Sequence, residues 1–426
     1  MVFHLEKSQR RTAIAAGVIG NIMEWYDFAL YGYMASILSV LFFPGDNKIA
    51  SLLATYGVFA AGFIMRPLGS LLFGWIGDKV SRSSAMMISV VMMALPTILL
   101  GLLPTYKAIG VLAPVLLVMV RLIQGLSVGG EFSSSVAYLV ETAPKNKRGL
   151  SGSYANVGSM AGMLLGSGLA SLTTSVLTSP QVHAWGWRLP FWFGAVLGIF
   201  AIWLRRHLPS STHFQKHANE REKTSPLKEA FTENLRETVQ AVLVASSYGA
   251  LFYISLVFLP NWLNEYIQFP LEKAMTINTL ATAILLILVP LMGWASDHFM
   301  RRTHIIALSV GIFGLSAYPL LFWLAGATLA AVITVQIGFA VLISVLCGVA
   351  PAMFVELFPT KDRLSGYSVA YNLGLGVVGG STPMICTWLI SFTGTKNALA
   401  GFILGVAVLG LIGLLWMTDR SREPLR

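Results

Sequence analysis

Long apolar runs separated by short polar stretches dominate the pattern of hydrophobic and polar positions along the chain. A helix that crosses a bilayer needs about 20 mostly apolar residues. Twelve segments reach that length, so the pattern predicts an all-α membrane protein with twelve transmembrane helices. The predicted spans are residues 12–43, 49–76, 84–104, 110–142, 150–177, 189–207, 238–264, 273–296, 304–326, 328–356, 364–392 and 397–418.

One long polar segment divides these helices into two sets of six. We therefore predict an N-terminal six-helix half over residues 1–207, a cytoplasmic linker over 208–237 and a C-terminal six-helix half over 238–426. Within the linker, Ser225 and Pro226 are typical of a helix start, because Ser caps free backbone N–H groups and Pro fits the first turn. A short amphipathic helix is expected to follow.

Basic residues predict the orientation, because cytoplasmic loops carry the excess of Lys and Arg. One alternating set of loops, together with the two chain ends, holds 22 of the 29 basic residues, and the other set holds 5. The remaining two, Arg66 and Arg121, lie within predicted spans. We therefore expect an integral protein of a bacterial inner (cytoplasmic) membrane with both termini in the cytoplasm.

The composition narrows the class of protein. The chain is 55% hydrophobic and 11% charged, whereas soluble domains carry about 25% charged residues. Its net charge of +10 does not indicate a nucleic-acid partner, because no basic stripe with interleaved aromatic residues is present. Cys347 and Cys386 lack metal-ligand spacing. We expect a monomer in the lipid bilayer with no metal or cofactor and no enzymatic activity.

Five acidic or basic residues lie well inside the predicted spans, away from the span ends, and all five are in the first third of the chain. A charge at the bilayer centre costs roughly 2.5–3.5 kcal/mol on insertion scales, so such groups face a partner or a water-filled path. They are candidates for a site that carries protons and recognises an anion. The five are Glu24, Asp27, Arg66, Arg121 and Glu131.

Helical spacing brings these groups onto shared faces. Glu24, Asp27 and Tyr31 recur at three to four residues in the first span, and the fourth span repeats this spacing with Arg121, Gln124, Val128 and Glu131. At ~1.5 Å of rise per residue, one layer near the midplane is predicted to hold Glu24, Arg66 and Glu131. A second layer is predicted to hold Asp27 and Arg121.

The chemistry of these groups suggests distinct roles. Burial disfavours an ionised carboxylate and a nearby arginine favours it, so motion that makes and breaks such a pair changes its protonation. We predict Asp27, paired with Arg121, as the main proton carrier, with Glu24 and Glu131 as further proton-coupling groups. Arg66 is predicted to anchor a substrate carboxylate through its planar fork. The alternative is a static ion network that holds the N-terminal half together.

The spans of the C-terminal half carry aromatic side chains where the first half carries charges. Aromatic faces bind quaternary ammonium groups by cation–π attraction. The candidates for this role include Tyr371 and its neighbour Asn372. The predicted substrate-binding set is Arg66, Arg121, Tyr31, Gln124, Tyr371 and Asn372.

Two motifs recur between the halves. Gly74–Arg82, with Asp78 inside it, is repeated as Gly293–Arg302 with Asp297, and Glu141–Arg148 is repeated as Glu356–Arg363. Both copies of the motif that contains Gly and Asp lie between the second and third spans of their half. Together the copies resemble the major facilitator superfamily, whose two pseudo-symmetric six-helix halves rock about a midplane site.

This resemblance implies gating contacts at the cytoplasmic ends. Asp78 and Asp297 are expected to hydrogen-bond to a helix end and to neighbouring arginines. Arg82 with Glu141, and Arg301 with Glu356, are expected to form ion pairs that hold the outward-open state. The alternative is that the arginines serve only to retain the loops inside. The full predicted gating set is Asp78, Arg82, Glu141, Arg148, Asp297, Arg301, Glu356 and Arg363.

Further strings resemble the metabolite:proton symporter family, whose members carry proline and betaine, 2-oxoglutarate, citrate or shikimate. The string over residues 20–28 is most similar to the proline/betaine transporters, whereas Arg121 departs toward the organic-acid members. One proton on the five-residue cluster makes it neutral, which suits a zwitterion. The resemblance implies proton-coupled symport of a small zwitterion such as proline or betaine, with an organic acid such as 2-oxoglutarate, citrate or shikimate as the alternative. Uniport, antiport and a sensor role stay open.

Overall fold

The computed structural model describes residues 21–79, 82–127, 131–141, 143–207, 234–360 and 363–425, and all regular structure in these ranges is helical. Residues 21–33 are helical and a turn at Met34 leads into α2 (Ala35–Phe42). The N-terminal half continues with α3 (Lys48–Lys79), α4 (Arg82–Leu102), α5 (Tyr106–Ile109), α6 (Leu112–Ser127), α7 (Glu131–Glu141), η1 (Lys145–Lys147), α8 (Arg148–Val176), α9 (Ser179–Gln181), η2 (Val182–Gly186) and α10 (Arg188–His207).

The C-terminal half has the same order of long helices. Its described part comprises α13 (Leu235–Tyr253), η3 (Ile254–Phe258), α14 (Leu259–Ile267), α15 (Leu271–His298), α16 (Arg302–Leu324), α17 (Leu329–Leu357), α18 (Arg363–Ala370), η4 (Tyr371–Gly379), α19 (Gly380–Thr393) and α20 (Ala398–Leu415). The predicted linker helix falls outside the described residues.

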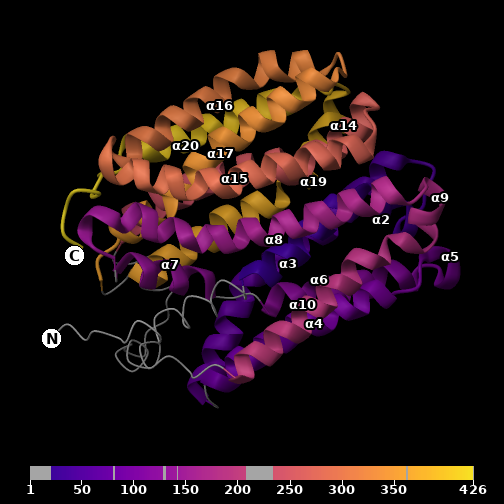
Figure 1. Ribbon diagram of the computed structural model, residues 1–426, viewed down its shortest axis with the longest axis horizontal. Coiled ribbons are helices and arrows are strands. Elements are labelled where there is room, and N and C mark those ends of the chain that lie inside the picture. Colours follow the sequence, from indigo (N-terminus) through magenta and orange to yellow (C-terminus); the bar gives the residue numbers. More distant parts are fainter. Residues whose placement is uncertain are drawn as a thin grey trace.

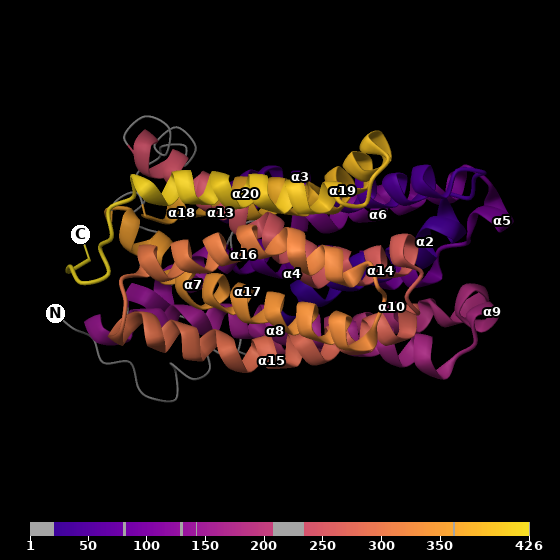
Figure 2. The ribbon, with the colours of Figure 1, turned by 90° about the horizontal axis from the view of Figure 1, so that it is seen from above.

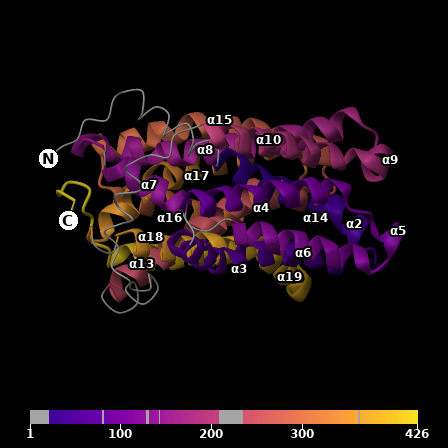
Figure 3. The same cartoon turned by 90° about the horizontal axis from the view of Figure 1, so that it is seen from below.

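The long helices run side by side from one end of the molecule to the other (Figure 1). The two halves lie next to each other, with α8 packed along α15 and α3 packed against α19 (Figure 2). The view from below shows the same end-to-end arrangement (Figure 3). We call one end the basic end: α15 and α17 finish there, α8 and α16 begin there, and the C-terminal segment lies there. The opposite end carries α5 and α9.

The apolar character of these helices fits a membrane. In the described part of the chain, seven helices are long and apolar enough to cross a bilayer, and three shorter apolar helices lie at Val91–Leu102, Leu112–Ser127 and Arg188–Phe200. The first span and α8 complete the set; α8 is less apolar because Gly and Ser recur along it. The twelve-helix prediction is confirmed.

Small residues let helices approach closely where the halves are built. A β-carbon on Gly162 of α8 would lie 2.2 Å from the Ile22 carbonyl oxygen, and one on Gly125 of α6 would lie 2.0 Å from the Gly62 carbonyl oxygen. In lipid, where burial of apolar surface gives no drive, such contacts bring helices together. The first span, α3, α6 and α8 are thereby held close around the predicted charged layers.

Two spans of the C-terminal half lose their α-helical hydrogen bonding partway along. Residues 254–258 and 371–379 are π-helical. Such segments are rare and often lie at functional sites. The second one passes the charged centre of the N-terminal half.

Candidate functional site

Arg66 and Glu24 form an ion pair in the middle of the bundle. Arg66 Nη1, from α3, lies 3.2 Å from Glu24 Oε1 on the first span. Arg66 is only 1% exposed and Glu24 is also buried. The pair agrees with the predicted first layer, and it lowers the cost of keeping both groups out of water.

Aromatic rings surround the Arg66 guanidinium. Its central carbon lies 4.3 Å from the Phe63 ring centre, 4.5 Å from that of Phe28 and 5.8 Å from that of Trp25. Cation–π attraction at such distances stabilises a desolvated guanidinium. Arg66 Nε and Nη2 are buried and donate no hydrogen bond to any described group of the protein. Two donors of the fork therefore remain for another acceptor.

The C-terminal half meets Arg66 with small and aromatic residues. A β-carbon on Gly376, in the π-helical stretch, would lie 3.9 Å from Arg66 Cδ. The Tyr253 ring packs edge-on to Phe63 at 5.3 Å and stacks with Trp25 at 6.4 Å. The Arg66 guanidinium therefore lies where the two halves meet, within an aromatic cluster that Tyr253 extends into the C-terminal half.

Tyr371 and Asn372 begin the same π-helical stretch. The Tyr371 ring stacks on Phe132 of the N-terminal half at 4.5 Å, and its buried hydroxyl has no partner among the described residues. Asn372 Nδ2 donates to the Ser368 carbonyl at 3.0 Å, within its own helix. Tyr371 thus joins the interface between the halves, whereas the Asn372 amide is engaged locally.

A second layer links Asp27 to Arg121 through two intermediates. Thr97 Oγ1, on α4, makes a short hydrogen bond with Asp27 Oδ2. Gln124 Nε2 donates to Thr97 Oγ1 at 3.0 Å, and Arg121 Nη1 donates to Gln124 Oε1 at 2.7 Å. All four side chains are buried. The result is a continuous polar chain across three spans.

The expected direct contact between Asp27 and Arg121 is not formed. Among the residues that the structure describes, no ion pair joins them, and the Arg121 guanidinium instead lies over the rings of Tyr31 at 4.4 Å and Phe28 at 4.6 Å. The Tyr31 hydroxyl donates to the Thr55 carbonyl at 3.2 Å. Phe28 contacts both arginines, so a single ring separates the two layers.

Three further predicted residues cannot be compared in the same way. Glu131 begins α7, Asp78 lies near the end of α3 and Arg82 begins α4. Their side chains lie outside what the structure describes. Their predicted roles stay predictions.

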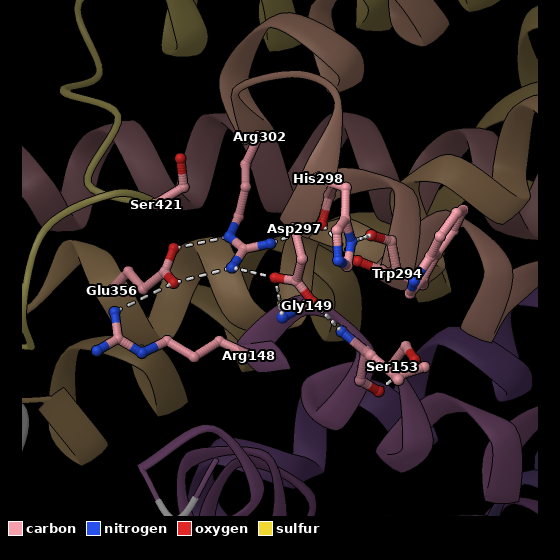
Figure 4. A network of polar contacts seen from close by, with 12 residues as sticks. Arg148, Gly149, Ser153, Trp294, Asp297, His298, Arg302, Glu356 and Ser421 are labelled. Atoms are coloured by element: carbon pink, nitrogen blue, oxygen red, sulfur yellow. Dashed lines mark hydrogen bonds and ion pairs between the residues drawn. The ribbon is translucent and has the colours of Figure 1, made fainter. Parts of the chain in front are cut away.

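At the basic end, Glu356 is the centre of an ion network (Figure 4). Arg302 Nε lies 2.8 Å from Glu356 Oε2, and Arg302 Nη2 lies 3.0 Å from Glu356 Oε1. The predicted partner, Arg301, is exposed at the start of α16, so that prediction was wrong by one residue. Since successive helical residues point about 100° apart, only one of the two arginines faces inward.

The same network crosses between the halves. Asp297, on α15, accepts hydrogen bonds from the backbone N–H groups of Gly149 at 2.8 Å and Leu150 at 2.9 Å. These are free N–H groups of the first turn of α8, where a carboxylate is favoured. Arg148 Nη1, also from α8, lies 3.7 Å from Glu356 Oε1. Figure 4 shows α8 held against the C-terminal half in this way.

A second ion pair crosses the basic end. Arg363 Nη1 donates to Glu141 Oε1 at 2.6 Å, and Arg363 Nε donates to the Val355 carbonyl at 3.0 Å. Glu141 ends α7 in the N-terminal half and Arg363 begins α18 in the C-terminal half. Among the described residues, Glu141 therefore pairs with Arg363 across the halves, whereas Glu356 has partners both within its half and across it.

The opposite end is also tied across the halves. Lys48 Nζ lies 2.7 Å from Glu265 Oε2, and Asn261 Nδ2 donates to the Gly32 carbonyl at 2.9 Å. Ser36 donates to Asn261 Oδ1 at 2.9 Å. Described contacts between the halves are thus present at both ends of the molecule.

Sequence reasoning missed several residues that complete the site. Thr97 carries a lone hydroxyl in an apolar stretch next to Pro96. This isolated polar group is the sequence feature that could have indicated its place in the site. Phe28, Phe63 and Trp25 read as ordinary apolar positions. Nothing in the sequence marks an aromatic ring that contacts a buried arginine.

Two sets of six helices in the same order, a charged centre where they meet and ion pairs across both ends are typical of secondary transporters that work by alternating access. Comparisons with known proteins name the family. The family model "Sugar (and other) transporter" matches residues 12–242 and "Major Facilitator Superfamily" matches residues 241–426. The chain belongs to the major facilitator superfamily, in its group of symporters, and is a transporter rather than an enzyme.

Individual relatives are similar to this chain over nearly its whole length. The proline/betaine transporter of Escherichia coli K12 is 32% identical, covering 99% of this chain and 86% of its own. The shikimate transporter of the same organism is 33% identical, covering 98% and 97%. A solved proton:xylose symporter bound to 6-bromo-6-deoxy-D-glucose superimposes with a TM-score of 0.73 at 16% identity, covering 99% and 98% of the chains. The bacterial relatives indicate an integral inner-membrane protein.

Proposed function

We propose that the chain is a proton-coupled symporter of a small zwitterion with a carboxylate group. The observation that carries this proposal is the Arg66 guanidinium, two of whose donors have no partner among the described residues and lie among aromatic rings where the halves meet. A substrate carboxylate would accept from Nε and Nη2 in the bidentate geometry that arginine favours.

The other end of such a substrate would meet aromatic faces. The rings of Trp25, Tyr253 and Tyr371 line the boundary between the halves. Aromatic faces attract quaternary and secondary ammonium groups. The relatives named for proline and betaine support a substrate with this pair of charges.

Charge counting supports one proton per zwitterion. With all five central groups ionised, three acids and two arginines sum to −1, and one bound proton makes the site neutral. We assign that proton to Asp27, the acid in the arginine-linked second layer, with Glu24 and Glu131 as secondary proton-coupling groups. Tyr31, Gln124 and Asn372 support the site from its edges.

An organic acid is the second candidate. Arg121 adds a second buried guanidinium, with Nε and Nη2 also free of hydrogen-bond partners among the described residues. The shikimate transporter is as similar to this chain as the proline/betaine transporter is, and it matches over more of its own length. A monoanion would need two bound protons.

We further propose that the basic end is cytoplasmic, with both termini inside, and that the protein acts as a monomer. Halves 1–207 and 238–426, joined by linker 208–237, would rock about the central site. Asp297, Arg302, Glu356 and Arg148 would close the cytoplasmic side together with Glu141 and Arg363, and Asp78 and Arg82 would act in the other motif copy.

The test is uptake and counterflow in proteoliposomes that contain a pH-sensitive dye. Proline, glycine betaine, shikimate, citrate and 2-oxoglutarate are offered with and without an inward proton gradient. Proton entry with a zwitterion supports the proposal, and Asp27→Asn should then abolish accumulation while exchange persists. Proton entry only with an organic acid supports the second candidate. Transport without proton movement contradicts both.

A further inference from the structure

We propose that Thr97 and Gln124 form a proton-sensing relay between Asp27 and Arg121, and that Asp27 carries a proton in the conformation in which these contacts are formed. This inference rests on the proposed proton-coupled symport. It adds two positioning residues and assigns the protonation state of one conformation.

Arg121 sets the direction of the hydrogen bonds in the relay. A guanidinium only donates hydrogen bonds, so the group that faces Arg121 Nη1 at 2.7 Å must be the Gln124 oxygen. The Gln124 amide orientation is thereby fixed, and its nitrogen faces Thr97 Oγ1 at 3.0 Å as a donor. One acceptor site of the Thr97 hydroxyl is therefore occupied.

Counting hydrogen atoms at Thr97 then gives the state of Asp27. Its hydroxyl has one hydrogen to donate and two lone pairs. It contacts the Met93 carbonyl at 2.9 Å and also the Asp27 Oδ2 atom. The Met93 carbonyl only accepts, so if it receives the Thr97 hydrogen, the hydrogen in the Asp27 contact must come from Asp27. All three contacts are satisfied together only when Asp27 is protonated.

Loss of that proton would reverse one hydrogen bond. The Oδ2–H bond of Asp27 breaks and the proton leaves for water on the side to which the site opens. The Thr97 O–H then turns from the Met93 carbonyl to Asp27 Oδ2, which now accepts. The Met93 carbonyl keeps its place in the helix, so this change needs only rotation of one hydroxyl group.

The other groups that face Asp27 leave this assignment intact. Arg121 from α6 is the facing charge, and Glu24, Tyr26, Tyr31 and Tyr33 are the other ionisable residues in the described part of its own helix. The Tyr26 hydroxyl donates to the Pro190 carbonyl at 2.5 Å. Arg66, the charge on α3, pairs with Glu24.

From α10, Gly194 is the neighbour. A β-carbon there would lie 3.2 Å from Asp27 Oδ1. Because Gly194 has no side chain, this residue offers Asp27 no side-chain proton donor. The α4 neighbour that bonds Asp27 is Thr97 itself.

The decisive variants are Thr97→Val, which keeps the shape and removes the hydroxyl, and Thr97→Ser, which keeps the hydroxyl. Hydrogen bonds to an ionised carboxylate are roughly twice as strong as those between neutral groups. Thr97→Val should therefore hold the proton more tightly. We expect the pH midpoint of proton-driven uptake to rise by on the order of one unit, a tenfold change in proton affinity, with counterflow retained. Thr97→Ser should match the parent.

Infrared difference spectroscopy of the protein in lipid supplies a readout that a purely structural role would not move. A protonated carboxyl band should be present in the parent, absent in Asp27→Asn and shifted to higher frequency in Thr97→Val, because its hydrogen-bond acceptor is gone. Gln124→Met should shift the pH midpoint as well, and its effect should be non-additive with that of Thr97→Val because both residues act in one relay.

The outcomes separate the two proposals. If Asp27→Asn still concentrates substrate against a gradient, Asp27 is not the proton carrier and the proposed function loses its central residue. If Asp27→Asn fails to concentrate substrate while Thr97→Val matches the parent in both pH midpoint and carboxyl band, the relay alone is wrong. Additive effects of Thr97→Val and Gln124→Met would also overturn it.

Discussion

Arg302 holds Glu356 with two nitrogen atoms, Nε at 2.8 Å from Oε2 and Nη2 at 3.0 Å from Oε1. The same guanidinium contacts Asp297 at 3.0 Å, and Asp297 in turn accepts from the first turn of α8. One buried arginine therefore connects an ion pair inside the C-terminal half to a helix end of the N-terminal half.

Arg302→Gln should weaken closure of the basic end. Removing one partner of a buried ion pair costs about 3–5 kcal/mol, and the part of this cost that falls on the contacts of Asp297 and Glu356 with α8 lowers the ratio of closed to open forms. The chain has two cysteines, so a Cys386→Ala background leaves Cys347 as the single thiol. Cys347 is fully buried, and its carbonyl accepts from Asn156 of α8 at 2.6 Å. The expected result is faster maleimide labelling of Cys347.

Arg301→Gln is the matched control for this experiment. Arg301 has the same charge one residue away but is exposed, so its loss should leave Cys347 labelling near the parent rate. Equal labelling in the two variants would mean that charge near the loop, rather than the contact with Glu356, closes this end.

Gly149→Ala should open the same end by a steric route. A β-carbon on Gly149 would lie 2.4 Å from the Gly293 carbonyl oxygen, a backbone atom that cannot rotate away. Overpacking of this kind costs typically about 1–3 kcal/mol. Cys347 labelling should rise, whereas Gly401→Ala, at a glycine with nothing within 4 Å, should leave it unchanged. Slow labelling in Gly149→Ala would show that the helices do not meet as described.

Arg66→Lys should weaken binding of a carboxylate substrate by about tenfold or more. Lysine keeps the charge but lacks the planar fork and the stacking that arginine makes with rings. Equilibrium binding of glycine betaine measures the effect, and choline, which keeps the quaternary ammonium but has no carboxylate, is the control ligand. Equal losses for both ligands would indicate damage to the pocket rather than a lost carboxylate contact.

Asp419 gives the C-terminal segment a defined response to pH. Burial acts to raise the pKa of this carboxyl, but hydrogen bonds from Ser421 and Thr303 outweigh it and hold the pKa below its ordinary value of 3.8. A depressed pKa adds stability above the ordinary value, and this stability is lost as the pH falls through the folded-state pKa. The Thr303 amide donates to Asp419 at 2.9 Å, so its exchange protection should be constant from neutral pH down to about pH 4 and fall below that.

Asp419→Ala should remove that protection at every pH, by about 0.5–2 kcal/mol as for other side chains that cap a helix start. Glu423→Gln is the control, because Glu423 contacts Arg148 through its backbone carbonyl, which the substitution keeps. Protection of the Thr303 amide that survives in Asp419→Ala would mean that the first turn of α16 is held by something else.

The number and order of the spans could be predicted because apolar length is a property of each segment alone. The Arg66–Glu24 layer could also be predicted, since rise per residue places both groups at similar depth. The choice between Arg301 and Arg302 could not, because it depends on the helical phase at which α16 begins. The separation of Asp27 from Arg121 was missed for a similar reason: Thr97 enters from α4, Gln124 lies three residues after Arg121 on α6, and helix rotation decides which side chains meet.

All the described polar and ring contacts of Arg66 and Arg121 come from the N-terminal half: Glu24, Trp25, Phe28, Tyr31, Phe63 and Gln124. Chains emerge from the ribosome N-terminal end first, and domains generally fold as units in that order. The first six helices can thus shelter both guanidinium groups before the seventh has been synthesised. Insertion of Arg66 and Arg121 into the membrane therefore needs none of the described contacts with helices that are synthesised later.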